Sequence, residues 1–344
     1  MRYILCLILF LLAGCDGREN VDSRILRFAS PYSPSHPFSK ADLRWMKFIE
    51  EESSGKIRID AFWSGSLLSS DHSMEEIRHG VADIGLITPI YAKGGAHLLR
   101  IQAGFYSGVT SMDNQTKLYR CMEKSSVQFD RELQGLKVLA VQGGNLPALI
   151  TRDVAVKNLE DLKGLRLRVP TELLEVFLEL GADPVSMPMG EVYSALAKGV
   201  IDGVAAPGDT FKSLHFSEVA GHFTQVEIPR GGYPSRAMSR ALWDSLHERE
   251  QALFEQSISV WEQALQEEIS ASLQAGLETA LEKGVEFHII SAEDQKTFDE
   301  VYLKIARKNA ASLNKYNIDG LRVFNVARES VVPGNRISCK GTGK

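Results

Sequence analysis

The first third of the chain alternates short apolar runs with amphipathic stretches. The runs at 24–30, 56–63 and 83–89 ("RILRFAS", "KIRIDAFW" and "DIGLITP") have the period of two that is typical of β-strands. The stretches between them, 38–55 and 73–82, repeat apolar residues every three or four positions, as helices do. Because strands that alternate with helices are joined by crossovers, this order predicts a parallel sheet.

The same alternation continues after residue 135 and predicts a second α/β unit. Two amphipathic stretches, 172–181 and 190–200, have helical spacing. The apolar runs that we expect to form strands are "LKVLAVQ" at 136–142, "LRLRVP" at 165–170, "DPVSMP" at 183–188, "IDGVAAP" at 201–207 and "FTQVEIP" at 223–229.

One long amphipathic segment predicts a helix from 249 to 283. Apolar residues recur in it every three or four positions, and Gly284 follows it as a terminator. Ser245 and Glu248 have the spacing of a capping box before it. At about 1.5 Å per residue the helix is ~50 Å long, more than one lobe needs. Two helices with an unmarked kink are the alternative to our interpretation, which is one helix lying across two lobes.

The N-terminus has the features of a signal peptide, which we exclude from the fold. Arg2 precedes an apolar stretch, and Leu12-Ala13-Gly14-Cys15 resembles a bacterial lipobox, in which the cysteine is lipidated. A plain signal peptide is the alternative. Asp16 resembles the signal that retains lipoproteins at the inner membrane.

Charge and cysteine content narrow the class of protein. A net charge of −5 over 344 residues, with no long basic run, argues against nucleic acid as the main partner. Export would permit a disulfide between Cys121 and Cys339. Because Cys339 lies in a polar tail that we expect to be frayed, two free thiols are favoured over a bridge.

Five blocks of the sequence carry a further signal: "LRFASPYSPSHPFSKA", "GKIRIDAFWSGSLLSS", "MEEIRHGVADIGLITPIYAKG", "LWDSL" and, most specifically, the block from 159 to 204 that contains "LKGLRLRVPTELL". Together they resemble the extracytoplasmic solute receptors of tripartite ATP-independent periplasmic (TRAP) transporters, the C4-dicarboxylate-type (DctP-like) family, as a divergent branch. The resemblance covers roughly residues 25 to 325.

This resemblance implies a two-lobed α/β periplasmic solute-binding fold with mixed, largely parallel sheets, hinge strands and a long helix spanning both lobes. It implies chain crossings near 143–146 ("QGGN" begins at Gln142) and near 232–235, and a membrane permease as partner. The expected division is 1–14 signal peptide, 15–24 lipidated linker, 25–144 plus 233–272 lobe I, 145–232 plus 273–328 lobe II, and 329–344 tail.

Arg168 is the first candidate for ligand binding. It lies just before Pro170, at the carboxyl end of a predicted strand, where open α/β sheets bind their ligands. In the resembled family the arginine of R-V-P pairs with the ligand carboxylate, and a guanidinium can hold a carboxylate through two hydrogen bonds. A surface ion pair with Glu172 or Asp161 is the alternative. Arg166, two residues earlier, is interpreted as a solvated or structural cation.

Two departures from the family pattern change the expected ligand. Ala206 stands where many members have asparagine, and the region after 136–142 has no arginine. Because polar partners for a second acidic group are missing, a monocarboxylate with an apolar or aromatic body is favoured over a C4-dicarboxylate. The further cleft candidates at strand ends and crossings are Tyr32, Trp63, Thr88, Tyr91, Asp209 and Tyr233.

No motif of a hydrolase, P-loop enzyme or metalloprotease is present, so we expect neither catalysis nor a cofactor or resident metal. The eight histidines are scattered along the sequence. The expected function is capture of a small organic carboxylate for import. A ligand-sensing receptor for a signalling partner and a structural lipoprotein remain as alternatives.

Overall fold

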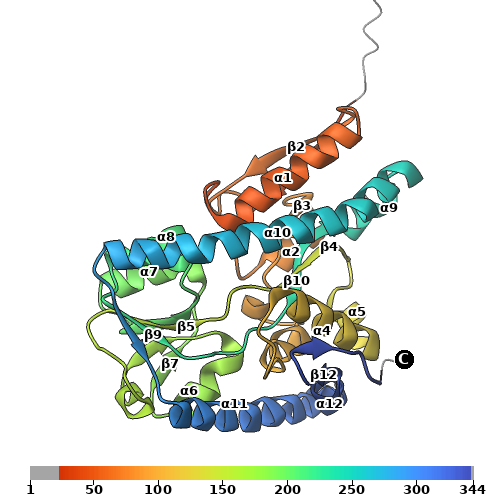
Figure 1. The fold of residues 1–344 in the computed structure, drawn as a ribbon. Helices are drawn as coiled ribbons and strands as arrows, with labels where there is room; N and C mark the ends of the chain where they lie inside the picture. The colour runs from red at the N-terminus through yellow and green to blue at the C-terminus, as the bar shows by residue number, and fades with distance from the viewer. Residues whose placement is uncertain (1–22, 342–344) are drawn as a thin grey trace, which may run out of the picture.

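The computed structural model describes residues 23–341, so the predicted signal peptide and Cys15 lie outside the described residues. Within them, two large sheets form the centres of two lobes (Figure 1). The first sheet has the order β2-β1-β3-β10-β4, with β1 Arg24–Ala29, β2 Ile57–Phe62, β3 Ile84–Leu86, β4 Leu136–Gln142 and β10 Tyr233–Ser239. The second has the order β11-β9-β5-β8-β6-β7, with β5 Ala148–Thr151, β6 Arg166–Arg168, β7 Asp183–Val185, β8 Gly203–Ala206, β9 His222–Gln225 and β11 Glu286–Ile289.

The predicted parallel crossovers are confirmed in the first lobe. β1 pairs in parallel with β2 and with β3, through α1 (Pro37–Glu52) and α2 (Ser73–Arg78). β10 then inserts between β3 and β4 and is antiparallel to both. In the second lobe β6 is parallel to β7 and β8, whereas β5 is antiparallel to β8 and β9. The fold is therefore mixed α/β, as expected.

Two strands that directly follow the crossings between the lobes escaped the sequence patterns. β5 and β10 are each buried along their whole length, so their sequences show no alternation of polar and apolar residues. The remaining helices, most of them short, are α3 His97–Ile101, α4 Met112–Ser125, α5 Gln128–Glu132, α6 Leu174–Glu179, α7 Met189–Ala197, α8 Thr210–Ser213, α9 Arg240–Ser245 and α12 Gly320–Ser330.

The long helix α10 runs unbroken from Glu248 to Glu282, which confirms one helix rather than two (Figure 1). It packs on α1 in the first lobe, where Trp261 stacks on Trp45 with ring centroids 3.6 Å apart, and on α8 in the second. The predicted cap was two residues off. Ser245 ends α9, and α10 begins after His247, whose backbone N–H donates to the Glu250 carboxylate at 2.9 Å.

A second long helix, α11 (Ala292–Ser312), lies on the opposite side of the molecule (Figure 1). Phe298 and Tyr302 on its first half pack with the core of the second lobe, around Phe177. Ala306 and Ala310 on its second half belong to the core of the first lobe. The division that the resemblance implies places 273–328 in lobe II, whereas α12 packs in the core of lobe I.

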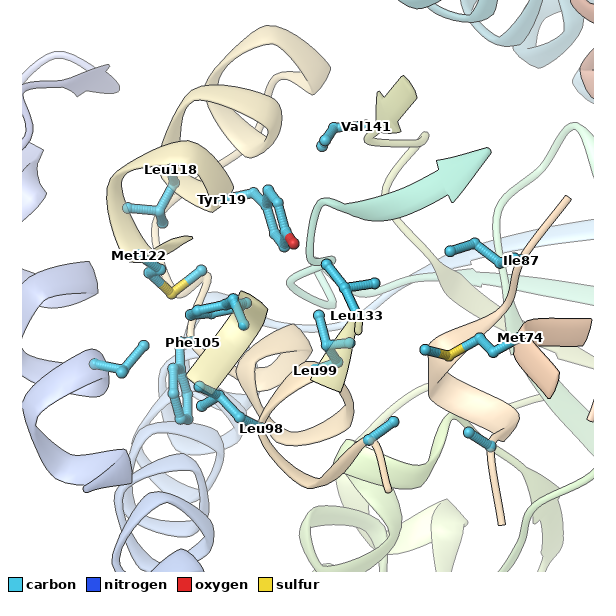
Figure 2. Packing of buried hydrophobic residues seen from close by; sticks show 14 of the residues in the cluster. Met74, Ile87, Leu98, Leu99, Phe105, Leu118, Tyr119, Met122, Leu133 and Val141 are labelled. Atoms are coloured by element: carbon cyan, nitrogen blue, oxygen red, sulfur yellow. The ribbon is translucent and has the colours of Figure 1, made fainter. Parts of the chain in front are cut away.

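One of the two core clusters of the first lobe gathers side chains from several short helices, whereas the other packs between α1 and α10. Figure 2 shows Leu98 beside Phe105, Met122 of α4 between Phe105 and Leu118, and Leu133 next to Leu99. All of these side chains are buried. This packing fixes the loops that carry the lobe I residues of the site.

The described part of the C-terminal tail packs against lobe I, contrary to the frayed tail that we expected. Val331 and Ile337, on the two short strands β12 (Val331–Val332) and β13 (Arg336–Ile337), pack against the core of lobe I. Cys339 then forms a disulfide with Cys121 of α4. The preference for two free thiols was therefore wrong, because tail packing brings the two cysteines together across 218 positions of sequence.

Candidate functional site

A cavity between the lobes, which we call the interlobe cavity, lies at the carboxyl ends of strands from both sheets. Tyr32 follows β1 and Thr88 follows β3, while Pro170 follows β6 and Asp209 follows β8. Strand ends of open α/β sheets are the usual place for ligands, since the crossover loops there diverge. The apolar lining residues are Phe38, Ile90, Ala103, Pro147, Pro170, Leu173, Met189, Ala205, Pro207, Leu214 and Pro229.

Arg168 reaches this cavity from the end of β6 and is only 1 % exposed. Its Nε donates to the Met187 carbonyl at 3.0 Å, and its Nη2 donates to the Tyr91 hydroxyl at 2.6 Å. Within residues 23–341, no carboxylate oxygen lies within 4.0 Å of its nitrogens. Burial of a cation without a counter-ion is costly, so this guanidinium is prepared for an anion from outside the chain.

Arg166 behaves differently, although it is on the same strand. Its side chain is about half exposed and forms an ion pair with Asp183 at 2.9 Å. Its backbone N–H donates to the carboxylate of Asp202. The structure thus places the two arginines as expected, one inside the cavity and one on the surface.

A second guanidinium, that of Arg230, lines the same cavity from the crossing between β9 and β10. Its Nη1 donates to the Asn145 carbonyl at 3.3 Å. A Cβ on Gly144 would lie 2.4 Å from the Arg230 Cζ, so glycine is needed at 144 for this approach. None of the four glycines at the two crossings (143, 144, 231 and 232) has positive φ. Close packing against neighbouring atoms, rather than backbone freedom, therefore explains why glycine stands at these positions.

Two acidic side chains complete the charged part of the cavity. Burial raises the pKa of Glu172 to about 7, although Arg168 and Arg230 act in the opposite direction. The buried Oε2 of Glu172 has no hydrogen-bond partner among the described residues. Burial also raises the pKa of Asp209, whose carboxylate accepts from the Asn145 amide at 2.9 Å. The two guanidiniums are therefore incompletely neutralised, and the cavity favours an anion.

Aromatic rings form the wall contributed by lobe I. The rings of Tyr32 and His36 stack with centroids 4.1 Å apart, and Phe38 meets both rings edge-on. Burial lowers the pKa of His36 to about 3, so this imidazole is neutral at physiological pH. Burial also raises the pKa of Tyr32 and Tyr233, which keeps both hydroxyls protonated. This wall offers flat apolar surface and neutral polar tips.

A buried polar chain connects the cavity wall to α10. The Tyr233 hydroxyl accepts a hydrogen bond from the side-chain amide of Gln142. The side-chain carbonyl of the same glutamine accepts one from Arg236 at 3.0 Å. Arg236 also donates to Asp42 at 2.7 Å, and Trp261 of α10 donates to the same carboxylate oxygen at 2.9 Å. This series of hydrogen bonds fixes the position of Tyr233 relative to the long helix α10.

The structure brings most of the predicted candidates together. Arg168, Tyr32, Thr88, Tyr91, Asp209 and Tyr233 all line the interlobe cavity. Trp63 does not; its ring packs against Phe28 in the core of lobe I, with centroids 5.6 Å apart. Sequence reasoning missed Arg230, Glu172 and His36 as cavity residues. A signal existed for Arg230, since it directly precedes the glycine pair of the second crossing.

No group of three metal-ligating side chains forms inside the cavity among residues 23–341; the one such group in this range lies on β9 and β11. Within the same range, no helix has the length and apolar character that a membrane crossing requires.

Comparisons with known proteins place the fold. A solute-binding protein of Chromohalobacter salexigens is 26% identical over 267 residues, covering 72% of this chain and 76% of that protein. A TRAP solute-binding protein of Rhodoferax ferrireducens, solved with copurified benzoate, has a TM-score of 0.80 at 24% identity, covering 89% of this chain and 97% of that one.

A marine metagenome TRAP solute-binding protein specific for aromatic acids, solved with metahydroxyphenylacetate, has a TM-score of 0.79 at 23% identity, covering 89% of this chain and 98% of that one. The model of the bacterial extracellular solute-binding protein family 7 matches residues 28–313. Because this match spans most of the chain and the fold agrees, the protein belongs to family 7 of the bacterial extracellular solute-binding proteins, the TRAP-type receptors.

Proposed function

We propose that this receptor captures a small organic monocarboxylate with an apolar or aromatic body in the interlobe cavity. The observation that carries the proposal is Arg168, a buried guanidinium with no carboxylate partner among the described residues. A ligand carboxylate would supply the missing counter-ion through a bidentate hydrogen-bonded pair.

Arg230 supports an anionic ligand from the other side of the cavity, where its guanidinium donates to the Asn145 carbonyl. The rest of the lining supports a single acidic group. Aromatic and aliphatic side chains dominate it, and Glu172 and Asp209 would repel a second carboxylate. Two relatives of the same fold were solved with aromatic monocarboxylates, which agrees with this chemistry.

Capture then follows from the two-lobed arrangement. Arg168 on lobe II already contacts Tyr91 on lobe I, so a ligand between them touches both lobes at once. Only a ligand that binds the closed arrangement more tightly than the open one can shift the lobes toward closure. The carboxylate meets this condition, since both guanidiniums reach it only when the cavity is formed.

The test is calorimetric titration of the mature protein with benzoate, mandelate and succinate. Arg168→Met should weaken binding of the preferred monocarboxylate at least tenfold, because it removes a charged hydrogen-bond pair in a buried site. Arg166→Met, on the same strand but at the surface, is the matched control and should bind as the wild type does. Equal affinities for Arg168→Met and wild type would refute the role of Arg168.

We also infer that the receptor delivers its ligand to a TRAP permease. Deletion of the gene should abolish uptake of the labelled acid if delivery is correct, whereas a purely sensory receptor would leave uptake intact.

We further infer that a lipid on Cys15 anchors the receptor to the membrane. Cys15→Ala should move the protein from the membrane fraction to the soluble periplasm. A wild-type protein already found in the soluble fraction would exclude the anchor.

A further inference from the structure

A cluster of two histidines and one glutamate lies at the outer edge of the second sheet, outside the interlobe cavity. His222 is on β9, and Glu286 and His288 are on β11, the edge strand that pairs in parallel with β9. Glu286 is the direct partner of His222 in this register. Because residues two apart on a strand share a face, His288 projects on the same side as Glu286.

The opposite face of β11 explains why this arrangement is held in place. Phe287 packs on Phe223 with ring centroids 5.1 Å apart, so the strand cannot rotate without losing that contact. The imidazoles are mostly buried, with 16 % and 14 % of the side chains of His222 and His288 exposed. The Glu286 side chain is 67 % exposed, which leaves the cluster open toward solvent.

The separations between the ligand atoms fit one metal geometry. The His288 Nε2 lies 3.3 Å from the His222 Nδ1, and the Glu286 Oε2 lies 3.5 Å and 3.8 Å from these two nitrogens. Metal–ligand bonds of about 2.0–2.1 Å arranged as a tetrahedron separate neighbouring ligand atoms by ~3.3–3.4 Å. Adjacent ligands of a square plane at the same bond length would be only ~2.9 Å apart.

We propose that His222, Glu286 and His288 bind a zinc ion. Two imidazole nitrogens favour a transition metal over Ca²⁺ or Mg²⁺, which prefer oxygen ligands, and the separations favour the tetrahedral geometry of Zn²⁺ over the square plane of Cu²⁺. Three protein ligands leave the fourth position open on the exposed side of Glu286, for water or another donor.

A second histidine cluster shows what distinguishes this one. His72 lies 3.6 Å from Asp71 and 3.4 Å from Glu75, which superficially resembles a metal site. There, however, the Lys93 ammonium binds the Asp71 carboxylate at 2.6 Å and supplies the positive charge. No lysine or arginine forms an ion pair with Glu286 within residues 23–341. His72 therefore provides a matched control.

The position of the site suggests a structural role for the ion. β11 begins shortly after α10 ends, and its backbone joins the sheet through β9 alone. Zinc bound by both strands would attach the outgoing end of α10 to the sheet of lobe II. Binding to the folded state alone would raise the melting temperature.

The experiment uses the mature protein after treatment with EDTA and dialysis. Calorimetric titration with ZnCl₂ should give one site per chain, and Zn²⁺ should raise the melting temperature by a few degrees. Cobalt substitution should give the intense visible absorption of a tetrahedral centre. His288→Gln should weaken zinc binding at least tenfold, whereas His72→Gln should bind as the wild type does.

Glu286→Gln gives a second variant whose exposed side chain leaves the core intact, and it should also lose affinity. No zinc binding by the wild type would overturn the proposal, as would wild-type affinity in both His288→Gln and Glu286→Gln. The direct hydrogen bond between the two imidazoles would then be the whole role of the cluster. Since none of the three residues lines the interlobe cavity, carboxylate binding serves as an independent check on folding.

Discussion

At the scale of single residues, the charge of the interlobe cavity depends on Glu172. Its carboxyl group faces Arg168 and Arg230 and has a pKa of about 7, which burial raises from the ordinary value. His36, Tyr32 and Tyr233 keep their neutral forms near pH 7. Glu172 therefore switches the cavity between two charge states in the physiological range.

Carboxylate affinity should fall as the pH rises from 6 to 8. Below pH 7 Glu172 is neutral and both guanidiniums are available, whereas above pH 7 its negative charge competes with the ligand for them. The dissociation constant should increase by up to about tenfold per pH unit above 7. Titration with a benzoate-type ligand, ionised over this whole range, measures the slope.

Glu172→Gln is the control for this pH dependence, because it keeps the shape and removes the ionisation. Its affinity should be nearly constant between pH 6 and 8. If the affinity of Glu172→Gln depends on pH as strongly as that of the wild type, the titrating group is instead Asp209, the other cavity acid whose pKa burial raises.

At the scale of elements, α10 approaches lobe II through a glycine. A Cβ on Gly276 would lie 2.3 Å from the Gly208 carbonyl oxygen and 2.6 Å from the Asp209 Cα. The helix backbone therefore packs directly on the segment that positions a cavity residue. Larger side chains at 276 would separate these elements.

Gly276→Ala should destabilise the protein, although alanine favours helices over glycine by about 1 kcal/mol. The clash with backbone should dominate and lower the free energy of unfolding by ~1–3 kcal/mol. Gly190→Ala is the matched control in the first turn of α7, where nothing lies within 4 Å of the added Cβ. It should be neutral or slightly stabilising. Urea unfolding measures the free energy of unfolding of both variants. Equal stabilisation by both would show that α10 can move away from Gly208 without loss of stability.

The sequence could predict elements with their own periodicity, and it could place residues relative to strand ends. The crossovers of the first lobe and the single long helix follow from such local patterns, whereas the separation of Arg168 from Arg166 also drew on the family resemblance. β5 and β10 could not be found in this way, since full burial removes alternation. The packing of Trp63 and the His222 cluster depend on which distant segments meet, and local patterns carry no such information.

At the scale of the whole molecule, the lobe I core includes residues from both ends of the described chain. α12 and the tail strands pack against α4, and the Cys121–Cys339 disulfide fixes that arrangement. Cross-linking residues so far apart in sequence restricts the unfolded chain strongly.

Cys339→Ser should lower the free energy of unfolding by about 2–5 kcal/mol. Reduction of the wild type with dithiothreitol should produce the same loss, because it opens the same loop. Cys121→Ser combined with Cys339→Ser should cost little more than Cys339→Ser alone. Denaturant titration measures all three, and an unaffected Cys339→Ser would show that packing alone holds the tail.

The tail also sets an order of events during biogenesis. Lobe I is assembled from the first strands of the chain together with α12 and the residues that follow it. Its core therefore cannot close until α12 and the residues as far as Cys339 have been synthesised. A chain interrupted before residue 320 would expose the apolar surface of α4 and Phe105, so we expect such a fragment to be degraded by quality-control proteases rather than to act as a shorter receptor.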